Sequence, residues 1–216
     1  MEPSGHPVPT TRKATATLLP ELHPGRAEAL LFDWDGTLVD SQYANYRAMA
    51  DALAPYGVTL DQEWFDARTG LSSADLVRTL AQTPGTRPDL PAEEIVADRD
   101  RRFLADAAAI RVHPQVAEVV HAHHGRLPMA VASGGTRLVI ETTLRHLPYR
   151  GLFTALVTRD DVRRGKPAPD IFLTAADALA VPPGRCLVYE DSDEGIEAAR
   201  AAGMAVIDVR PVTGRA

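Results

Sequence analysis

Short runs of apolar residues recur along the chain, and glycine, proline or acidic residues bound each of them. Runs of three or four apolar residues between turn-forming residues are typical of buried β-strands. The pattern therefore predicts five buried strands, at residues 29–32, 129–132, 155–157, 187–189 and 205–207.

Helical patterns alternate with these runs. Residues 114–124 begin at Pro114, a residue favoured in the first turn of a helix, and residues 194–202 end at Gly203, a typical helix stop. This alternation predicts an α/β fold with a doubly wound, Rossmann-like parallel-sheet core. Ligands of such sheets bind beyond the carboxyl ends of the strands, so polar residues at those ends are candidates for a functional site.

Between residues 43 and 110 the pattern of apolar and polar residues is helical, and no strand pattern interrupts it. Ser72 is followed three residues later by Asp75, which resembles a capping box, and residues 83–88 are rich in turn-forming residues and predict a surface loop. We expect an inserted helical cap domain at residues 43–110 and a core domain formed by residues 26–42 and 111–216.

Composition narrows the class of protein. The chain has 216 residues, 45% of them hydrophobic and 24% charged, which suits one globular α/β core with a smaller module. Its first 25 residues hold five prolines among scattered polar residues, and we predict a disordered leader at residues 1–25. No apolar stretch approaches the length of a membrane span.

Charge and cysteine content bear on partners and compartment. The formal net charge of -6 argues against nucleic acid as a partner, because phosphate backbones favour clustered basic residues. The single cysteine, Cys186, cannot form an internal disulfide, which fits a reducing compartment. We expect a cytoplasmic protein that binds neither nucleic acid nor membranes and is a monomer or a weak homodimer.

Two carboxylates one residue apart, Asp33 and Asp35, follow the first predicted strand, and Gly36 lets the chain turn tightly after them. One such acid can attack a phosphorus atom, while the other gives a proton to the leaving oxygen and later takes one from water. Carboxylates are also common in turns and helix caps, so the pair alone is weak evidence for catalysis.

Polar residues follow two more predicted strands, and a lysine precedes a predicted helix. Ser133 and Gly134 offer a hydroxyl and backbone N–H groups to an anion, although a helix N-cap explains them equally well locally. Lys166 precedes a proline that restricts it to an extended conformation, and an isolated lysine is usually a surface residue. Glu190 and Asp191 place two acids at another strand end.

The sequence DWDGTLVDS, at residues 33–41, resembles the first signature of the haloacid dehalogenase-like hydrolase superfamily. The strings SGG, GKPAPD and EDSDEG, which begin at Ser133, Gly165 and Glu190, resemble the second, third and fourth signatures. The resemblance implies a nucleophile and a general acid/base for phosphatase chemistry, phosphate-binding groups and magnesium ligands. These are Asp33 and Asp35 for catalysis, Ser133, Gly134 and Lys166 for phosphate, and Asp33, Asp35, Glu190 and Asp191 for the metal.

A cation is also expected on physical grounds if the fold brings these acids together, because their mutual repulsion would raise their pKa values. Mg²⁺ prefers oxygen ligands, and Asp35 is expected to contribute its backbone carbonyl so that its carboxyl stays free for proton transfer. The prediction is a Mg²⁺-dependent phosphatase that hydrolyses a small phosphorylated metabolite, a sugar phosphate, through an aspartyl-phosphate on Asp33.

The order of the signatures, with the cap between the first and second, resembles the β-phosphoglucomutase-like branch of the superfamily. The strings RLPMAV and GIEAARAAGM resemble bacterial fructose-1-phosphate phosphatases most. The cap departs from the branch at three positions: Asn45 stands where many members have histidine, and Thr69 and Ser73 stand where the mutases have lysine and arginine. These departures disfavour a phosphoglucomutase.

The sequence also allows other hypotheses about the function. A β-phosphoglucomutase-like mutase would use the same aspartyl-phosphate, and a catalytically silent phosphate-binding protein would keep the fold. A dehalogenase is disfavoured because Asp35 supplies the proton-transfer group of phosphatases. Metal capture by His121, His123 and His124 is disfavoured too, since only the first and third share a helix face and no acidic partner is evident.

Overall fold

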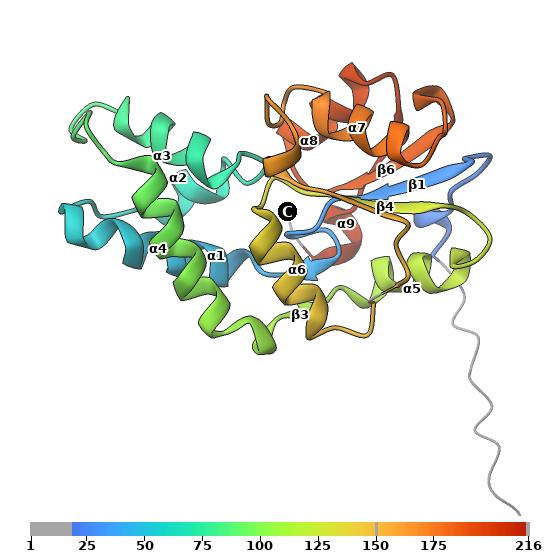
Figure 1. Cartoon of the computed structure of the whole chain (residues 1–216), viewed down its shortest axis with the longest axis horizontal. Helices are drawn as coiled ribbons and strands as arrows, with labels where there is room; N and C mark the ends of the chain where they lie inside the picture. Colours follow the sequence, from blue (N-terminus) through green and yellow to red (C-terminus); the bar gives the residue numbers. More distant parts are fainter. Residues whose placement is uncertain (1–18, 150, 215–216) are drawn as a thin grey trace, which may run out of the picture.

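A five-stranded parallel sheet forms the centre of the computed structural model, which describes residues 19–149 and 151–214 (Figure 1). Its order is β5-β4-β1-β6-β7, and all five strands lie where the apolar runs predicted them, which confirms the α/β fold class. The strands are β1 (Ala29–Phe32), β4 (Met129–Ala132), β5 (Ala155–Val157), β6 (Cys186–Glu190) and β7 (Ala205–Asp208).

The central strand β1 is buried along its whole length and pairs in parallel with β4 and β6. Phe32, its last residue, lies in register with Val131 on one side and Tyr189 on the other. The chain runs from β1 to β4 and β5 on one side, then returns to β6 and β7 on the other side. The carboxyl ends of β1, β4 and β6 are therefore neighbours at the point where strand order reverses, the usual ligand site of such sheets.

Helices cover both faces of the sheet because successive side chains of β1 point to opposite sides. Leu30 and Phe32 belong to an apolar layer with α5 (Pro114–His123), α6 (Arg137–Arg145) and the region of α9 (Arg210–Thr213). Ala29 and Leu31 belong to the opposite layer, with α7 (Asp170–Ala178) and α8 (Asp193–Ala201). Figure 1 shows the second layer above the sheet and the first below it.

The predicted helix starts and stops around these layers are confirmed. Helix α5 begins at Pro114, and Gly203, with a φ of 75°, follows the end of α8. Positive φ is a conformation that glycine adopts without strain, which explains why the chain can leave the helix there. Short 3-10 helices complete the connections: η1 (Pro20–Leu22), η2 (Ala54–Tyr56), η3 (Ala107–Ala109), η4 (Arg159–Asp161) and η5 (Pro183–Arg185).

Four α-helices between residues 42 and 105 form a group beside the sheet, which we call the cap helices (Figure 1). They share their own buried cluster, to which Met49, Phe65 and Ile95 belong. The loop expected at residues 83–88 separates the third helix from the fourth. The cap helices are α1 (Gln42–Leu53), α2 (Gln62–Asp66), α3 (Ser73–Ala81) and α4 (Ala92–Ala105).

Two short strands that the sequence pattern did not predict join the cap helices to the rest of the chain. They are β2 (Val39–Asp40) and β3 (Arg111–Val112), which pair antiparallel. The chain therefore leaves and re-enters the core through two adjacent segments. Runs of only two residues carry no hydrophobic periodicity, which explains why they were missed.

The predicted leader needs a correction. Residues 1–18 lie outside the described residues, but within residues 19–25 η1 forms and Leu22 and Pro24 are buried, so this part of the predicted leader is ordered. Leu22 is fully buried, and its carbonyl accepts a hydrogen bond from the Tyr189 hydroxyl at 2.7 Å. A buried hydroxyl requires such a partner, which ties this segment to β6.

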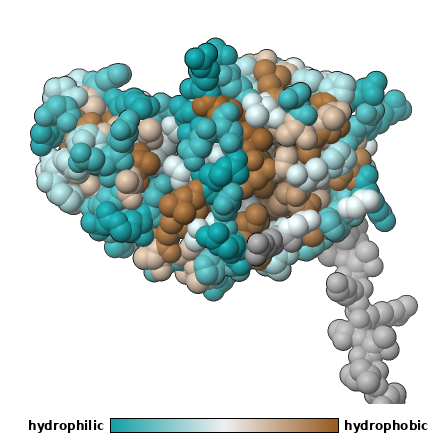
Figure 2. Space-filling model, viewed as in Figure 1, coloured by the Kyte–Doolittle hydropathy of each residue, from teal (hydrophilic) through white to brown (hydrophobic). Residues whose placement is uncertain are grey.

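Hydrophilic and apolar residues are unevenly distributed over the surface. In the view of Figure 2, hydrophilic residues predominate over the cap helices, and apolar residues form patches over the middle of the molecule. Among the helices of residues 19–149 and 151–214, none has the length and apolar character needed to cross a bilayer.

We expect Phe32→Ala to lower the free energy of unfolding by about 3–5 kcal/mol, because it leaves a cavity in the centre of the sheet. The Phe32 ring stacks on Tyr189 at 4.9 Å between centroids and meets Phe153 edge-on at 6.0 Å. Chemical denaturation measures the change. Leu138→Ala, at a leucine that is 60% exposed, is the control and should change stability by less than about 0.5 kcal/mol; equal effects would contradict this account of the core.

Candidate active site

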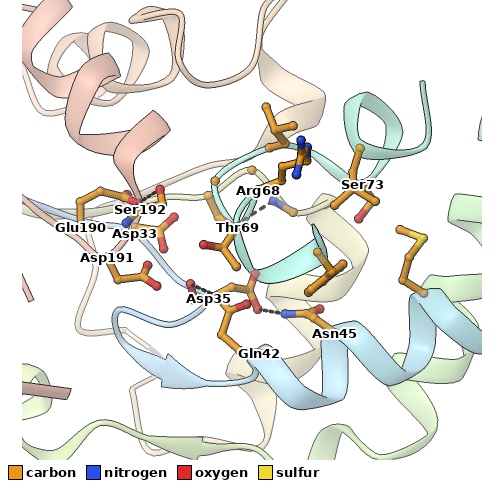
Figure 3. Close-up of a pocket in the computed structure, with 18 of the residues that line it drawn as sticks. Asp33, Asp35, Gln42, Asn45, Arg68, Thr69, Ser73, Glu190, Asp191 and Ser192 are labelled. Carbon is orange, nitrogen blue, oxygen red and sulfur yellow. Dashed lines mark hydrogen bonds between the residues drawn. The ribbon is translucent and has the colours of Figure 1, made fainter. Parts of the chain in front are cut away.

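The carboxyl ends of β1 and β6 and the loop before α7 bring four charged side chains together. Asp33 follows β1, Glu190 ends β6, Asp191 follows it, and Lys166 lies in the loop between β5 and α7. All four are at least 95% buried. Residues from three distant parts of the sequence thus meet at the predicted edge of the sheet. Figure 3 shows Asp33, Glu190 and Asp191 among them.

Lys166 is the positive centre of this group. Its Nζ atom donates to Asp33 Oδ1 at 2.6 Å and to Glu190 Oε2 at 2.7 Å. Burial raises the pKa of Asp33 well above its ordinary value, and the Glu190 charge adds to this, while Lys166 opposes it. Burial alone would lower the pKa of Lys166, but the charges of Asp33 and Glu190 outweigh it and raise that pKa.

Three of the acids form a candidate metal site. Asp33, Glu190 and Asp191 each offer a carboxylate oxygen, and these oxygens lie within 4.8 Å of one another. One ammonium group cannot balance three buried carboxylates, so the site has an excess of negative charge. Such an all-oxygen donor set with excess negative charge fits a hard divalent cation.

Hydroxyl groups hold two of these acids in place. Glu190 Oε1 accepts from the Ser192 hydroxyl at 2.5 Å, and Asp191 Oδ1 accepts from the Thr37 hydroxyl at 3.0 Å. Ser192 also accepts from the Gly195 N–H as the N-cap of α8. Sequence reasoning did not select Thr37 or Ser192, although both stand inside the strings that carried the resemblance.

Asp35 faces the cap helices. Its Oδ1 atom accepts hydrogen bonds from the Ser41 hydroxyl at 2.5 Å and from Asn45 Nδ2 at 2.9 Å. Its backbone carbonyl accepts from Gln42 Nε2 at 3.2 Å. Gly36, with a φ of 86°, makes the tight turn after Asp35, and the Asp35 carboxylate is not part of the group formed by the three acids. Asp33 and Asp35 thus occupy different environments, which suits two carboxylates with different chemical roles.

Ser133 and Gly134 follow β4 and line the same cavity. Ser133 is buried, and its Oγ atom accepts from the Gly135 N–H at 3.0 Å. A side chain at Gly134 would approach the Gly70 carbonyl of the cap side to 3.5 Å. The turn therefore lies where a phosphate group between core and cap would meet it.

A cavity of about 70 Å³ lies between these residues and the cap helices. Since about 10–15 Å³ of this kind of space holds one water, the cavity has room for roughly five water-sized groups, the size of a phosphoryl group. Core and cap residues both line it. The cap contributes apolar side chains (Met49, Phe65, Leu71 and Leu76) and polar ones (Asn45, Thr69, Ser73, Arg68 and Arg99).

Two arginines of the cap line the cavity, although sequence reasoning did not select them. Thr69 and Ser73 line the cavity as expected, but Arg68 and Arg99 also line it from neighbouring positions. Arg99 is only 5% exposed. Basic residues on a charged helix usually lie on its solvated face, so the local sequence does not distinguish Arg99 from a surface arginine.

A chain of hydrogen bonds connects Asp35 to Arg99 and back to the core. Asn45 donates to Asp35 and accepts from Arg99, and Arg99 pairs with Asp100 at 2.7 Å. Asp100 in turn accepts from the Thr136 hydroxyl of the core at 2.7 Å. The position of the Asp35 carboxylate therefore depends on contacts between cap and core.

The histidines considered for metal capture have other surroundings. The His121 ring lies 5.2 Å from that of Tyr149, and His123 Nδ1 contacts the Val119 carbonyl at 2.9 Å. Among the described residues, the only group found with the spacing of a metal site is Asp33, Glu190 and Asp191.

We expect Gly195→Ala to lower the free energy of unfolding by about 1–3 kcal/mol, because the added methyl group overpacks the site. A Cβ atom at Gly195 would lie 2.1 Å from Cδ of the buried Glu190. The matched control is Gly184→Ala, where the nearest heavy atom would be 4.0 Å away. Thermal and chemical denaturation of both variants measure the difference, and equal stabilities would show that Glu190 moves aside freely.

Comparison with known proteins agrees with this geometry. Residues 27–203 match the family model of haloacid dehalogenase-like hydrolases. The chain is 36% identical over 189 residues to the fructose-1-phosphate phosphatase YqaB of Escherichia coli, covering 86% of this chain and 97% of that protein.

Among solved structures, CbbY from Rhodobacter sphaeroides in complex with phosphate has a TM-score of 0.74 and 31% identity, covering 83% of this chain and 84% of that one. β-Phosphoglucomutase from Clostridium difficile, at 22% identity and a TM-score of 0.74 over 83% of both chains, shares the fold. The chain belongs to the haloacid dehalogenase-like hydrolase family.

Proposed function

We propose that this protein is a Mg²⁺-dependent phosphatase that hydrolyses a small phosphate monoester, a sugar phosphate, through an aspartyl-phosphate on Asp33. The observation that carries the proposal is the buried contact of Asp33 with Lys166, beside Glu190 and Asp191. This arrangement supplies a nucleophile and a metal-capable acid group that line the cavity, and a cation for the phosphoryl charge that contacts Asp33 and Glu190. The named phosphatase among the relatives supports it.

The proposed metal ligands are the carboxylates of Asp33, Glu190 and Asp191 and the backbone carbonyl of Asp35. When bound, Mg²⁺ supplies positive charge that offsets the repulsion among these acids and the incoming phosphate. Thr37 and Ser192 hold Asp191 and Glu190 by the hydrogen bonds described above and would fix them as ligands.

In the first step Asp33 attacks phosphorus, and the bond from phosphorus to the leaving oxygen breaks. Asp35 gives its proton to that oxygen, so the alcohol leaves neutral. Lys166 stabilises the charge of the transferred phosphoryl group, and Ser133 and the Gly134 N–H bind its oxygens. Asp35 is suited to this role because its carboxylate stands apart from the three acids and faces the cap, where the leaving group lies.

In the second step Asp35, now ionised, takes a proton from a water molecule that attacks phosphorus of the aspartyl-phosphate. The bond between phosphorus and the Asp33 oxygen breaks, which restores the Asp33 carboxylate and releases inorganic phosphate. Lys166 again lies beside the oxygen that acquires negative charge. The cycle therefore returns both carboxylates to their starting states.

The proposed cap domain, residues 43–110, closes over the substrate and selects it. Its helices line one wall of the cavity, and the narrow two-strand connection at β2 and β3 permits movement. The proposed partner is a small phosphorylated metabolite. The cytoplasmic location and the monomeric or weakly dimeric state stay predictions.

We expect Asp33→Asn to reduce kcat for phosphate monoesters by at least about 10³-fold, because the amide cannot act as the nucleophile. Asp40→Asn is the control, since it removes an exposed carboxylate from the same signature and should keep nearly full activity. Release of inorganic phosphate measures turnover, and thermal denaturation shows that both variants fold. Retained turnover in Asp33→Asn would contradict the mechanism, and a folded wild-type enzyme without turnover would favour a silent phosphate-binding protein.

Removal of divalent metal by a chelator should abolish phosphate release, and added Mg²⁺ should restore it. Mg²⁺ should also raise the melting temperature of the wild type, because it binds the folded site and offsets the repulsion among buried acids. Asp191→Asn should reduce this shift. A melting temperature that does not respond to Mg²⁺ would argue against the proposed metal site.

A further inference from the structure

The two arginines that line the cavity differ in how their charges are balanced. Arg99 pairs with Asp100 and contacts Asn45, so its charge is neutralised inside the cap. Arg68 also lines the cavity but has no carboxylate within ion-pair distance among the described residues. The cavity therefore has one cap guanidinium whose charge is not balanced by a direct partner.

Arg68 is nevertheless held in position. Its Nη1 atom donates to the Trp64 carbonyl at 2.9 Å, and its guanidinium carbon lies 4.2 Å from the centre of the Trp64 ring. A guanidinium stacked on an indole ring loses less freedom when it binds an anion, since its plane is already oriented. The remaining N–H groups can serve a ligand.

The turn that carries Arg68 is tightly seated on the core. A side chain at Gly70 would lie 2.5 Å from the Ser192 hydroxyl, so only glycine permits this approach. Burial raises the pKa of Glu194, beside this contact, above its ordinary value, and the charge of Arg68 opposes this. The turn thus places Arg68 over the cavity opposite the core residues that receive the phosphoryl group.

We propose that Arg68 binds a second anionic group on the leaving group, so that the preferred substrates are short phosphate monoesters with another phosphate or a carboxylate. This inference rests on the phosphatase function proposed above. The transferred phosphoryl group already has Lys166, Ser133 and Gly134 as its partners. An additional cap guanidinium is therefore available to the part of the substrate that lies toward the cap, and its planar donors match either anion.

The volume of the cavity favours a short leaving group. About 70 Å³ accommodates the phosphoryl group and few further atoms while the cap lies as it does in this structure. The apolar side chains Met49, Phe65 and Leu76 also line the cap side and offer no hydrogen bonds to the leaving group. Recognition of the leaving group thus depends on the few polar groups of the cap, of which Arg68 is the unbalanced cation.

Paired substrates test this proposal. Glycerol 1-phosphate against 3-phosphoglycerate compares a neutral leaving group with one that carries a carboxylate. Fructose 1-phosphate against fructose 1,6-bisphosphate makes the comparison for a second phosphate. We expect wild-type kcat/KM to be at least about tenfold higher for the anionic member of one pair or both, as one charge-assisted hydrogen bond provides.

The variants Arg68→Gln and Arg68→Lys assign any preference to this side chain. Arg68→Gln should lower kcat/KM for the preferred anionic ester about 10- to 100-fold and change the neutral ester by less than about threefold. Arg68→Lys should recover part of the loss, because it restores the charge without the planar donors. Arg47→Gln is the matched control: it removes an exposed arginine of α1 that stacks on Tyr43 outside the cavity, and both rates should stay the same.

The outcomes separate this inference from the proposed function. Hydrolysis of neutral and anionic esters at similar rates, or an equal loss on both in Arg68→Gln, would overturn the role of Arg68 and leave the phosphatase intact. A folded wild type that hydrolyses none of the four esters with Mg²⁺ would overturn the substrate class proposed here. Thermal denaturation of Arg68→Gln confirms folding, and Arg68→Lys provides the same test if the glutamine variant is unstable.

Discussion

Lys166 places one ammonium group between two buried carboxylates, those of Asp33 and Glu190, at distances of 2.6 and 2.7 Å. Charges taken out of water are costly unless they are paired and hydrogen-bonded. With Asp191 beside them, the acids still outnumber the cation, and burial raises the pKa of Asp33. The surrounding structure must therefore hold like charges together, and the resulting unbalanced site is suited to a cation and a phosphate group.

Several neighbouring residues hold these buried acids in place. The Ser192 and Thr37 hydroxyls each bind one of the acids, and Gly195 leaves the space that Glu190 occupies. Thr37 follows β1, whereas Ser192 and Gly195 lie at the start of α8 after β6, and they meet because β1 and β6 are neighbours in the sheet. The rigid, fully buried central strands thus provide the positions, and the loops beyond them provide the chemistry.

Residues of the cap also fix the orientation of the Asp35 carboxylate. Asp35 is oriented by Asn45, whose other contact is the buried Arg99, and Asp100 then returns to Thr136 of the core. The proton-transfer group we propose is consequently held by residues of both parts of the molecule. A cap that moved away would release these contacts together, so closure and correct orientation of Asp35 are expected to accompany one another.

The amino-acid sequence by itself determined the five core strands, the helical character of the cap and the acids at the strand ends, because apolar runs and turn residues are local signals. It also carried the strings that resemble the family signatures. Tertiary structure alone decided that Leu22 packs on the core, that β2 and β3 pair, and that Arg68 and Arg99 line the cavity. These features depend on contacts between residues far apart in the chain, and a charged residue on a helix has the same local pattern whether it faces water or a buried site.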